Sequence, residues 1–298
     1  MPSFQLSARQ IQILLMMTVI WGVNWTVMKY ATNQMPPLTF RTTSMVLALI
    51  TFWVMAASMK ITLKVPRPLL PRVLLLAIPN MIGWHILCIL AVNELSAGRA
   101  AILGYTMPVW AVLAGLFFGQ TMNRRAWAGL ALAMLGVMLL LFNELQSIVG
   151  KPLGVLLMLS AASCWGLGTA LIRRYPTGLH ALTFTHATLY PTIASMALAT
   201  WVLEGSRFAI PTGFSQWWPV FYNAVGVLAF CQMGWFSLAS SLPPIVSTLS
   251  IMVIPVVGVM SGVVFLGEQP RWTDLAALGS ILAAMAVVLV PSKKADAL

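Results

Sequence analysis

Two stretches of the chain return later at a constant separation of 144 residues. Val19-Ile20-Trp21-Gly22 is matched by Ser163-Cys164-Trp165-Gly166, and Leu38-Thr39-Phe40-Arg41 is matched by Leu182-Thr183-Phe184-Thr185. Each copy holds five long apolar segments, and an odd number of membrane spans places the following copy upside down in the bilayer. The sequence therefore predicts an inverted repeat, which is the plan of many secondary transporters.

The composition places these segments in a lipid bilayer. The chain is 60% apolar and 8% charged, with a mean hydropathy of +0.90, whereas soluble domains contain about 25% charged residues. Runs of about 17 to 25 apolar residues are long enough to cross the hydrocarbon layer. We expect ten such spans, at approximately residues 11–28, 38–59, 73–92, 100–118, 126–142, 153–172, 179–203, 217–238, 244–266 and 272–290.

The predicted fold is an all-α membrane protein in which two inverted five-helix repeats surround a central cavity. We expect the first repeat at residues 1–142, a linker at 143–151 and the second repeat at 152–298. The connections are too short for a soluble catalytic domain. The cysteines lie inside spans without metal-ligand spacing, and Gly166-Leu167-Gly168 lies within an apolar helix, where it cannot form a dinucleotide loop. We therefore expect no catalytic residue, no metal and no cofactor.

The excess of positive charge follows the predicted topology. The chain has 17 Lys and Arg against 6 Asp and Glu. The membrane side that holds both termini carries eleven of these basic residues and the other side carries six. Because basic residues gather on the cytoplasmic side, we expect both termini in the cytoplasm and no nucleic-acid partner.

Prolines occupy matching positions in the fourth and ninth spans. Pro108 and Pro255 are 147 residues apart, and each removes a backbone hydrogen bond and opens a kink in its helix. We expect these two prolines to act as hinges or to line the cavity. Gly258 and Gly262, which follow at a spacing of four, allow close helix packing or mark a moving gate.

The ionisable residues argue against ion-driven transport. Carriers driven by protons or sodium usually keep an ionisable group near the membrane midplane. Lys29, Arg41 and Arg99 lie near one face, so we expect no cationic clamp at the midplane. These features favour facilitated passage of solutes that bind weakly. All six acidic residues lie at span ends, in loops or in the tail, at Glu94, Glu144, Glu204, Glu268, Asp274 and Asp296.

Polar and aromatic side chains inside spans are the candidates for the cavity lining. His85 lies opposite Gln232 at the 147-residue offset, and this pair is either a structural hydrogen bond or a substrate contact. Indole rings attract apolar solutes and ammonium groups, although each ring could equally pack against lipid or the core. The candidate substrate-binding residues are Trp21, Asn24, Asn80, Trp84, His85, Tyr105, Trp110, Trp165, His186 and Gln232.

Several short motifs keep a characteristic order along the chain. They are Trp21-Gly22-x-Asn24 followed by Lys29, Pro37 with Arg41, Met107-Pro108-Val109, Ile254-Pro255-Val256 and Leu266-Gly267-Glu268. In this order and duplication, the chain resembles the drug/metabolite transporter superfamily, specifically its EamA branch of ten-helix carriers. Within that branch it is similar to the YddG-type exporters of Gram-negative inner membranes. The resemblance implies alternating access between two half-bundles and efflux of aromatic and other neutral amino acids.

The expected function is export of amino acids and related small metabolites across a bacterial inner membrane by a monomer embedded in lipid. One alternative is a proton-coupled antiporter of drugs or metabolites, which would need an ionisable group within the membrane. An alternative from another class is a polytopic membrane enzyme that uses His85 or His186, although neither histidine is accompanied by a nucleophile or a metal ligand.

Overall fold

The computed structural model describes residues 8–119, 124–146, 151–234 and 244–289, which form helices and contain no strand. The first half comprises α1 (Ala8–Gln34), α2 (Pro37–Met59), η1 (Arg67–Leu69), α3 (Leu70–Ala77), η2 (Ile78–Gly83), α4 (Trp84–Glu94), α5 (Ala97–Gly104), α6 (Met107–Phe117) and α7 (Arg124–Gln146). The second half comprises α8 (Pro152–Arg174), α9 (Ala181–Leu203), η3 (Gly205–Arg207), α10 (Phe214–Phe221), η4 (Tyr222–Cys231), α12 (Pro244–Leu266) and α13 (Trp272–Leu289). The predicted all-helical fold is therefore confirmed for these residues.

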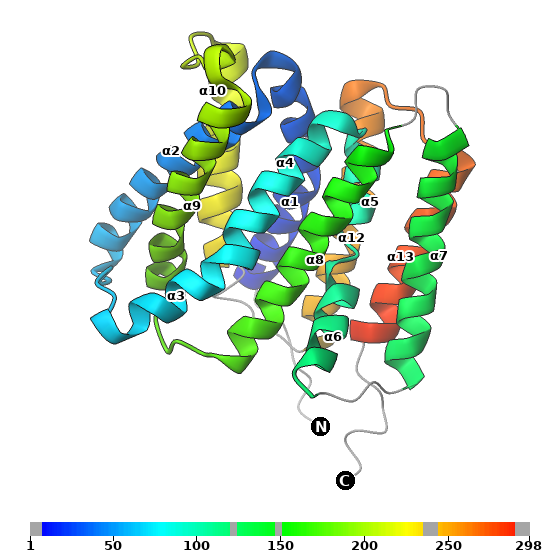
Figure 1. Cartoon of the computed structure of the whole chain (residues 1–298), viewed down its shortest axis with the longest axis horizontal. Coiled ribbons are helices and arrows are strands. Elements are labelled where there is room, and N and C mark those ends of the chain that lie inside the picture. The colour runs from blue at the N-terminus through cyan, green and yellow to red at the C-terminus, as the bar shows by residue number, and fades with distance from the viewer. Residues whose placement is uncertain (1–7, 120–123, 147–150, 235–243, 290–298) are drawn as a thin grey trace.

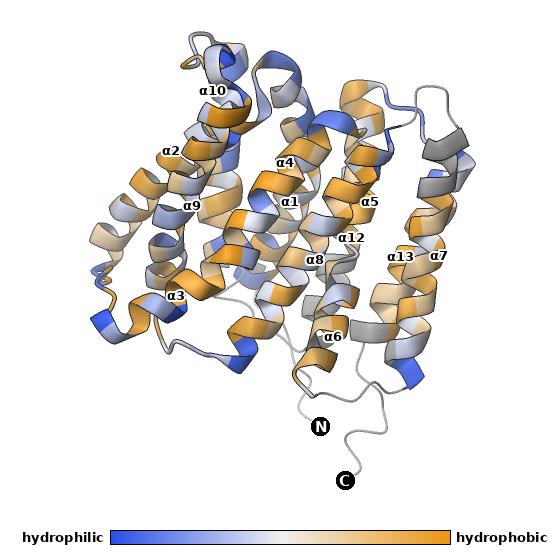
Figure 2. Cartoon of the chain, in the orientation of Figure 1, coloured by the Kyte–Doolittle hydropathy of each residue, from blue (hydrophilic) through white to orange (hydrophobic). Residues whose placement is uncertain are grey.

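Several of these helices have the length and composition of membrane spans. Among the described residues, five helical segments are long and apolar enough to cross a bilayer: Arg9–Gln34, Pro37–Met59, Arg67–Glu94, Ala97–Phe117 and Pro152–Arg174. Figure 2 shows apolar residues along the middle of the helices and hydrophilic residues gathered toward their ends. The chain is a multi-pass membrane protein.

Helices from the two halves of the chain alternate in one bundle. Figure 1 shows α1 near the middle, with α2, α9 and α10 on the left and α7 and α13 on the right. The most extensive helix pairs join the halves, because α1 packs on α12, α8 packs on α4 and α6, α2 packs on α9, and α7 packs on α13. The buried apolar side chains that the structure describes form one large cluster drawn from both halves, so both halves build the interior of the bundle.

Glycines allow two of these pairs to approach closely. A Cβ atom added at Gly22 in α1 would lie 2.5 Å from the Cβ of Val257 in α12, and one added at Gly166 in α8 would lie 2.6 Å from the backbone nitrogen of Ala111 in α6. Such distances leave no space for a side chain. The repeated Trp-Gly pair therefore marks close contacts between α1 and α12 and between α8 and α6.

Two carboxylates fix helix ends at the upper side of the bundle in Figure 1. Glu204, which follows α9, accepts hydrogen bonds from the backbone nitrogens of Leu38 and Thr39 at the start of α2, at 2.6 and 2.8 Å. Glu268, which follows α12, accepts bonds from Ala97 and Gly98 at the start of α5, at 2.6 and 3.0 Å. A carboxylate satisfies free backbone donors and complements the helix dipole there. Each carboxylate thus ties one half of the chain to the other.

The third span of each half contains a π-helical segment. Residues Ile78–Gly83 and Tyr222–Cys231 are wound as π-helices, between α3 and α4 in the first half and after α10 in the second. Widening of a helix in this way changes the direction of its side chains and is frequent at functional sites. The two segments place Asn80 and Asn223 in the interior of the bundle.

The matching prolines occupy different positions in their helices. Pro108 is the second residue of α6, after a break in the helical path at Tyr105 and Thr106. Pro255 lies inside α12, which continues past it. A proline at a helix start removes no intrahelical bond, whereas one in a helix interior removes a bond and favours a kink. Pro255 therefore lies where a kink within a helix is favoured, whereas Pro108 lies directly after a break between two helices.

Candidate functional site

A chain of hydrogen bonds links α1, α2 and η4 in the interior. The Asn223 amide donates to the Oδ1 atom of Asn24 at 2.7 Å, and the Asn223 Oδ1 atom accepts a bond from Nη1 of Arg41 at 2.6 Å. All three side chains are buried, at 8% exposure for Asn24, 0% for Asn223 and 2% for Arg41. Polar groups that are withdrawn from solvent in this way are costly unless they are paired. We call Asn24, Arg41 and Asn223 the polar cluster.

Two members of the polar cluster, Arg41 and Asn223, are absent from the predicted site residues. The position of Arg41 close to the start of its span predicts a place near one face, yet the structure encloses it almost completely. One signal is present in the sequence: Arg41 is the one charged residue in α2, and its counterpart in the second half is Thr185. Asn223 joins the cluster through the π-helical turn of η4, which apolar periodicity does not reveal.

His85 lies in α4, beside the polar cluster. The α4 helix packs on both α1 and α2. The His85 side chain is 6% exposed, and its Nδ1 atom has no hydrogen-bond partner within the described part of the chain. No hydrogen bond joins it to Gln232 among the described residues, where Gln232 is only partly buried. An unsatisfied buried donor or acceptor of this kind is available for a ligand.

Aromatic pairs line the contacts between helices of the bundle. Trp84 of α4 and Trp165 of α8 have ring centroids 5.3 Å apart, and Trp25 of α1 meets Tyr105 edge-on at 6.2 Å. The Trp110 indole donates to the hydroxyl of Thr106 at 3.1 Å. Each of the four tryptophans among the candidate residues is partly buried: Trp21, Trp84, Trp110 and Trp165. The structure therefore brings Trp84 and Trp165 together across the two halves.

Asn80 takes part in a different contact from that of Asn24. A Cβ atom at Gly168 in α8 would lie 2.6 Å from the Cβ of Asn80. Gly168 of α8 is the counterpart of Asn24 of α1. Gly168 packs closely on η2, whereas Asn24 contacts η4 through its side-chain amide. The sequence difference between Asn24 and Gly168 is explained by this close approach, because a side chain at 168 would collide with Asn80.

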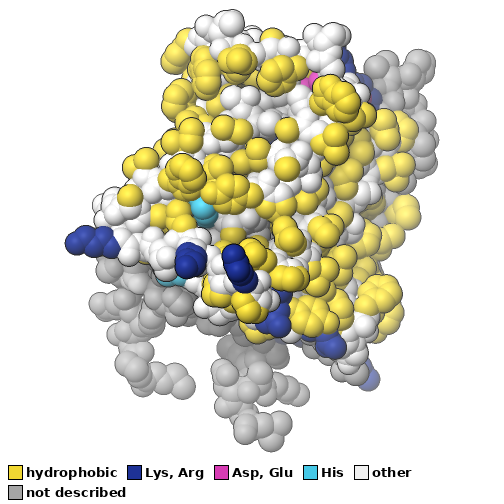
Figure 3. Space-filling view, turned by 60° about the vertical axis from the view of Figure 1, so that its left-hand side comes forward, with side chains coloured by type: hydrophobic (Ala, Val, Ile, Leu, Met, Phe, Trp, Pro, Cys, Tyr) yellow, Lys and Arg dark blue, Asp and Glu magenta, His cyan; other side chains and the backbone are white. Residues whose placement is uncertain are grey.

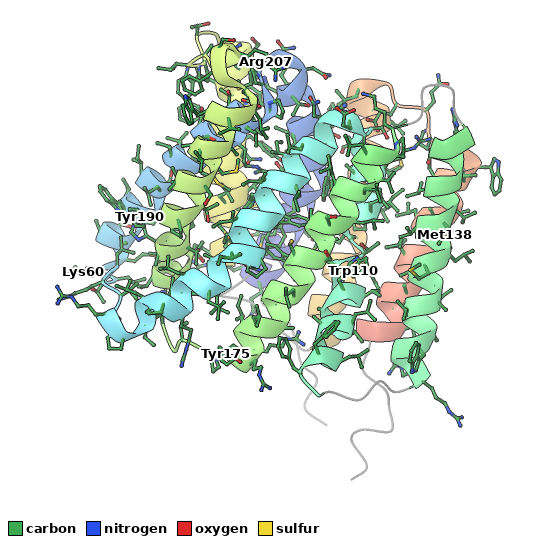
Figure 4. All side chains as sticks on the ribbon, in the orientation of Figure 1. Lys60, Trp110, Met138, Tyr175, Tyr190 and Arg207 are labelled. Atoms are coloured by element: carbon green, nitrogen blue, oxygen red, sulfur yellow. The ribbon has the colours of Figure 1, made fainter. Side chains whose placement is uncertain are left out.

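His186 lies on a flank of the bundle. Its Nε2 atom shares a hydrogen bond of 3.2 Å with the Tyr190 hydroxyl, and its ring lies 6.3 Å from that of Trp53. Tyr190 and Trp53 are 46% and 54% exposed, so both face outward. Figure 4 shows Tyr190 on the left side of the molecule and Trp110 on the other side of α4. The structure thus separates His186 from the remaining candidates.

A cavity of about 570 Å³ opens at the upper ends of α1, α2, α4 and α9. Polar groups from four helix ends surround it, and none of the ten predicted site residues lines it. Leu38, one helical turn before Arg41 in α2, belongs to its wall. The lining residues are Thr32, Asn33, Gln34, Met35, Pro36, Pro37, Leu38, Leu90, Asn93, Glu94, Leu203, Glu204 and Arg207.

Comparison with known proteins places this architecture among membrane transporters. The model of the EamA-like transporter family matches residues 9–142 and 152–290. The chain is 28% identical to a protein of Escherichia coli K12 described as a probable amino-acid metabolite efflux pump, with 90% of each chain covered. It is 26% identical to the uncharacterized inner membrane transporter YedA of the same organism, over 91% of this chain and 87% of that one.

The fold itself is shared with a protein of known crystal structure. The two structures align with a TM-score of 0.65 at 18% sequence identity, over 96% of this chain and 99% of the other. Similarity at this level of identity concerns the fold alone. The family match covers both halves, and it shows that the chain belongs to the EamA-like transporter family, within the drug/metabolite transporters.

Proposed function

We propose that this EamA-family transporter exports aromatic and other neutral amino acids, and that transport needs no coupled ion. The observation that carries the second part is the location of the described carboxylates. Glu94 ends α4, Glu204 follows α9, Glu268 follows α12 and Asp274 lies in the first turn of α13. A carboxylate at a helix end, already engaged by backbone donors or by a basic side chain, is poorly placed to carry a coupling ion through the membrane.

The side chains in the interior of the bundle and one group of relatives support the proposed substrate class. Indole rings at Trp84 and Trp165, with the amides of Asn24 and Asn223, suit solutes that have an apolar side chain and a polar head. A relative that is 27% identical, from Salmonella typhimurium, is likewise described as a probable amino-acid metabolite efflux pump, with 91% of each chain covered.

We infer that transport proceeds by alternating access between two oppositely oriented repeats, expected at residues 1–142 and 152–298. In an inverted repeat, equivalent helices make equivalent contacts with the opposite half. Gly22 of α1 accordingly contacts Val257 of α12, and Gly166 of α8 contacts Trp110 and Ala111 of α6. Lys60 follows α2 and Arg207 follows α9, and Figure 4 shows these two residues at opposite ends of the bundle. Equivalent helices that run in opposite directions support an inverted repeat.

The orientation that we propose places both termini in the cytoplasm of a bacterium, with the protein acting as a monomer. In Figure 3, Lys and Arg side chains gather along the lower edge of an apolar surface. The α1 helix begins and the α13 helix ends at that same lower side (Figure 1). The excess of basic residues on the cytoplasmic side supports this assignment, and the cavity then faces the periplasm.

The test is transport by the purified protein in liposomes. Labelled phenylalanine and leucine should equilibrate across the membrane when pH and sodium concentration are equal on both sides. Empty liposomes and an excess of unlabelled solute serve as controls. Accumulation that occurs only when a proton or sodium gradient is imposed would contradict the proposal.

One observation favours a proton-coupled carrier as the second candidate. The Nδ1 atom of His85 is buried and unpartnered within the described residues, and an imidazole can carry a proton through a membrane. In that case a pH gradient should drive phenylalanine uphill in the liposome experiment, and His85→Gln should abolish the uphill movement while equilibration continues.

A further inference from the structure

The guanidinium of Arg41 is buried among neutral groups. Its Nη1 atom donates to Asn223 at 2.6 Å and its Nη2 atom contacts the sulfur of Met28 at 2.9 Å. Its Nε atom has no acceptor in the part of the chain that the structure describes. Arginine remains charged in proteins and offers five N–H donors. The polar cluster therefore provides partners for only some of the N–H donors of a cation that is withdrawn from water.

The described carboxylates are all engaged away from Arg41. Glu204 and Glu268 accept backbone hydrogen bonds at the starts of α2 and α5. Glu94 pairs with Lys151 at 3.1 Å, and Asp274 pairs with Arg99 at 2.9 Å. Burying a cation without an anionic partner costs several kcal/mol. The free donors of Arg41 could instead bind the anion of a ligand, because arginine and carboxylate groups form strong, often bidentate hydrogen bonds.

The polar cluster also holds the guanidinium in a fixed orientation. Asn223, which is presented by the π-helical turn of η4, is itself oriented by its bond of 2.7 Å to Asn24. Side chains from α1, α2 and η4 therefore hold the forked guanidinium group of Arg41 in place before any ligand binds. A preorganised fork suits bidentate binding of a carboxylate, for which lysine would be a poor substitute.

We propose that Arg41 binds the carboxylate of the transported solute, which makes the free α-carboxylate the feature that the carrier selects. The proposal rests on the function proposed above and names the part of the substrate that is recognised. In this proposal the solute approaches through the cavity at the upper ends of α1, α2, α4 and α9, where the lining residue Leu38 lies one helical turn from Arg41. His85 is buried on α4, which packs on α1 and α2, and its unpartnered nitrogen is available to the solute's second polar group.

The first test is competition against labelled phenylalanine entering liposomes that contain the purified full-length protein. Phenylalanine itself should compete at least about tenfold better than phenylalanine amide, since hydrogen bonds to charged groups contribute about 1.5 to 3 kcal/mol. Arg41→Gln should bring the two competitors within about threefold of each other, because a neutral hydrogen bond contributes only about 0.5 to 1.5 kcal/mol. Arg41→Lys, which keeps the charge and loses the fork, should give an intermediate ratio.

A second variant separates a binding role from a structural one. Asn223→Asp places a carboxylate beside Nη1 of Arg41 with almost no change in side-chain size, and the Asn24 amide can rotate to donate to it. The new ion pair should preserve or raise the thermal unfolding midpoint while it removes the preference for the free acid. A purely structural arginine would be better satisfied by this change, and the preference would persist.

Lys29 provides the matched control. Its ammonium donates to the backbone oxygens of Val92 and Asn93 at 3.1 and 2.8 Å, so its acceptors belong to the protein. Lys29→Gln should leave the ratio of acid to amide unchanged. If Asn223→Asp and Arg41→Gln retain the wild-type ratio while they unfold at normal temperatures, the assignment of Arg41 is overturned.

A binding measurement keeps this result separate from the transport proposal. Phenylacetate should raise the unfolding midpoint of the detergent-solubilised protein, and the rise should disappear in Asn223→Asp. Stabilisation without flux would support the Arg41 site and contradict amino-acid transport. If the protein transports phenylalanine but Arg41→Gln and Asn223→Asp keep the wild-type acid-to-amide ratio, the Arg41 site alone is contradicted. The absence of both stabilisation and flux would overturn both proposals.

Discussion

At the scale of single residues, the repeated glycines have the clearest physical role. Gly22→Ala and Gly166→Ala each introduce a methyl group where a neighbouring helix lies 2.5 to 2.6 Å away. Overpacking of this kind typically costs about 1 to 3 kcal/mol. Both variants should therefore unfold at a lower temperature in detergent. Gly279→Ala in α13 is the control, because no atom lies within 4 Å of its added Cβ; equal midpoints for all three variants would contradict the close packing.

The two membrane histidines should differ in their effect on transport. His85 lies in the interior next to the polar cluster, whereas His186 lies under the outward-facing rings of Trp53 and Tyr190. His85→Ala should change the order of preference among neutral amino acids in a competition assay, with little change in folded yield. His186→Ala should leave that order as it is. A larger change of preference in His186→Ala would mean that the transport path runs along the flank.

At the scale of helices, Glu204 anchors the start of α2. It accepts bonds from the Leu38 and Thr39 nitrogens and from the Thr39 hydroxyl, the last at 2.6 Å. In Glu204→Gln, an amide N–H group would face donors, so we expect a loss of about 1 to 3 kcal/mol and a lower unfolding midpoint. Glu94→Gln breaks a half-exposed ion pair with Lys151 and should cost less than about 1 kcal/mol. A smaller effect at Glu204 than at Glu94 would contradict the anchoring role.

The helices also show where the sequence is informative. The apolar runs predict helices near their observed positions, because the length of a span is set by the thickness of the hydrocarbon layer. The burial of Arg41 could not be predicted, since its partner Asn223 lies in a π-helical segment of the other half, which apolar periodicity does not reveal. The place of His186 beneath outward-facing rings could not be predicted either, because lipid and core are both apolar and the pattern along α9 does not distinguish them.

At the scale of the whole molecule, the two halves depend on each other. The two carboxylate anchors, the close contacts of Gly22, Gly166 and Gly168, and the polar cluster each join an element of the first half to one of the second. In an alternating-access carrier such contacts must break and re-form in turn on the two sides of the substrate. The halves are therefore expected to move against each other and not to fold independently.

Cysteine accessibility tests the opposite orientation of the halves most directly. Cys88, Cys164 and Cys231 are first replaced, and single cysteines are then introduced as Lys60→Cys after α2 and Arg207→Cys after α9. In intact cells, a membrane-impermeant maleimide should label position 207 and should label position 60 only after permeabilisation. Labelling of both positions from the same side of the membrane would contradict the inverted repeat and, with it, alternating access between the two halves.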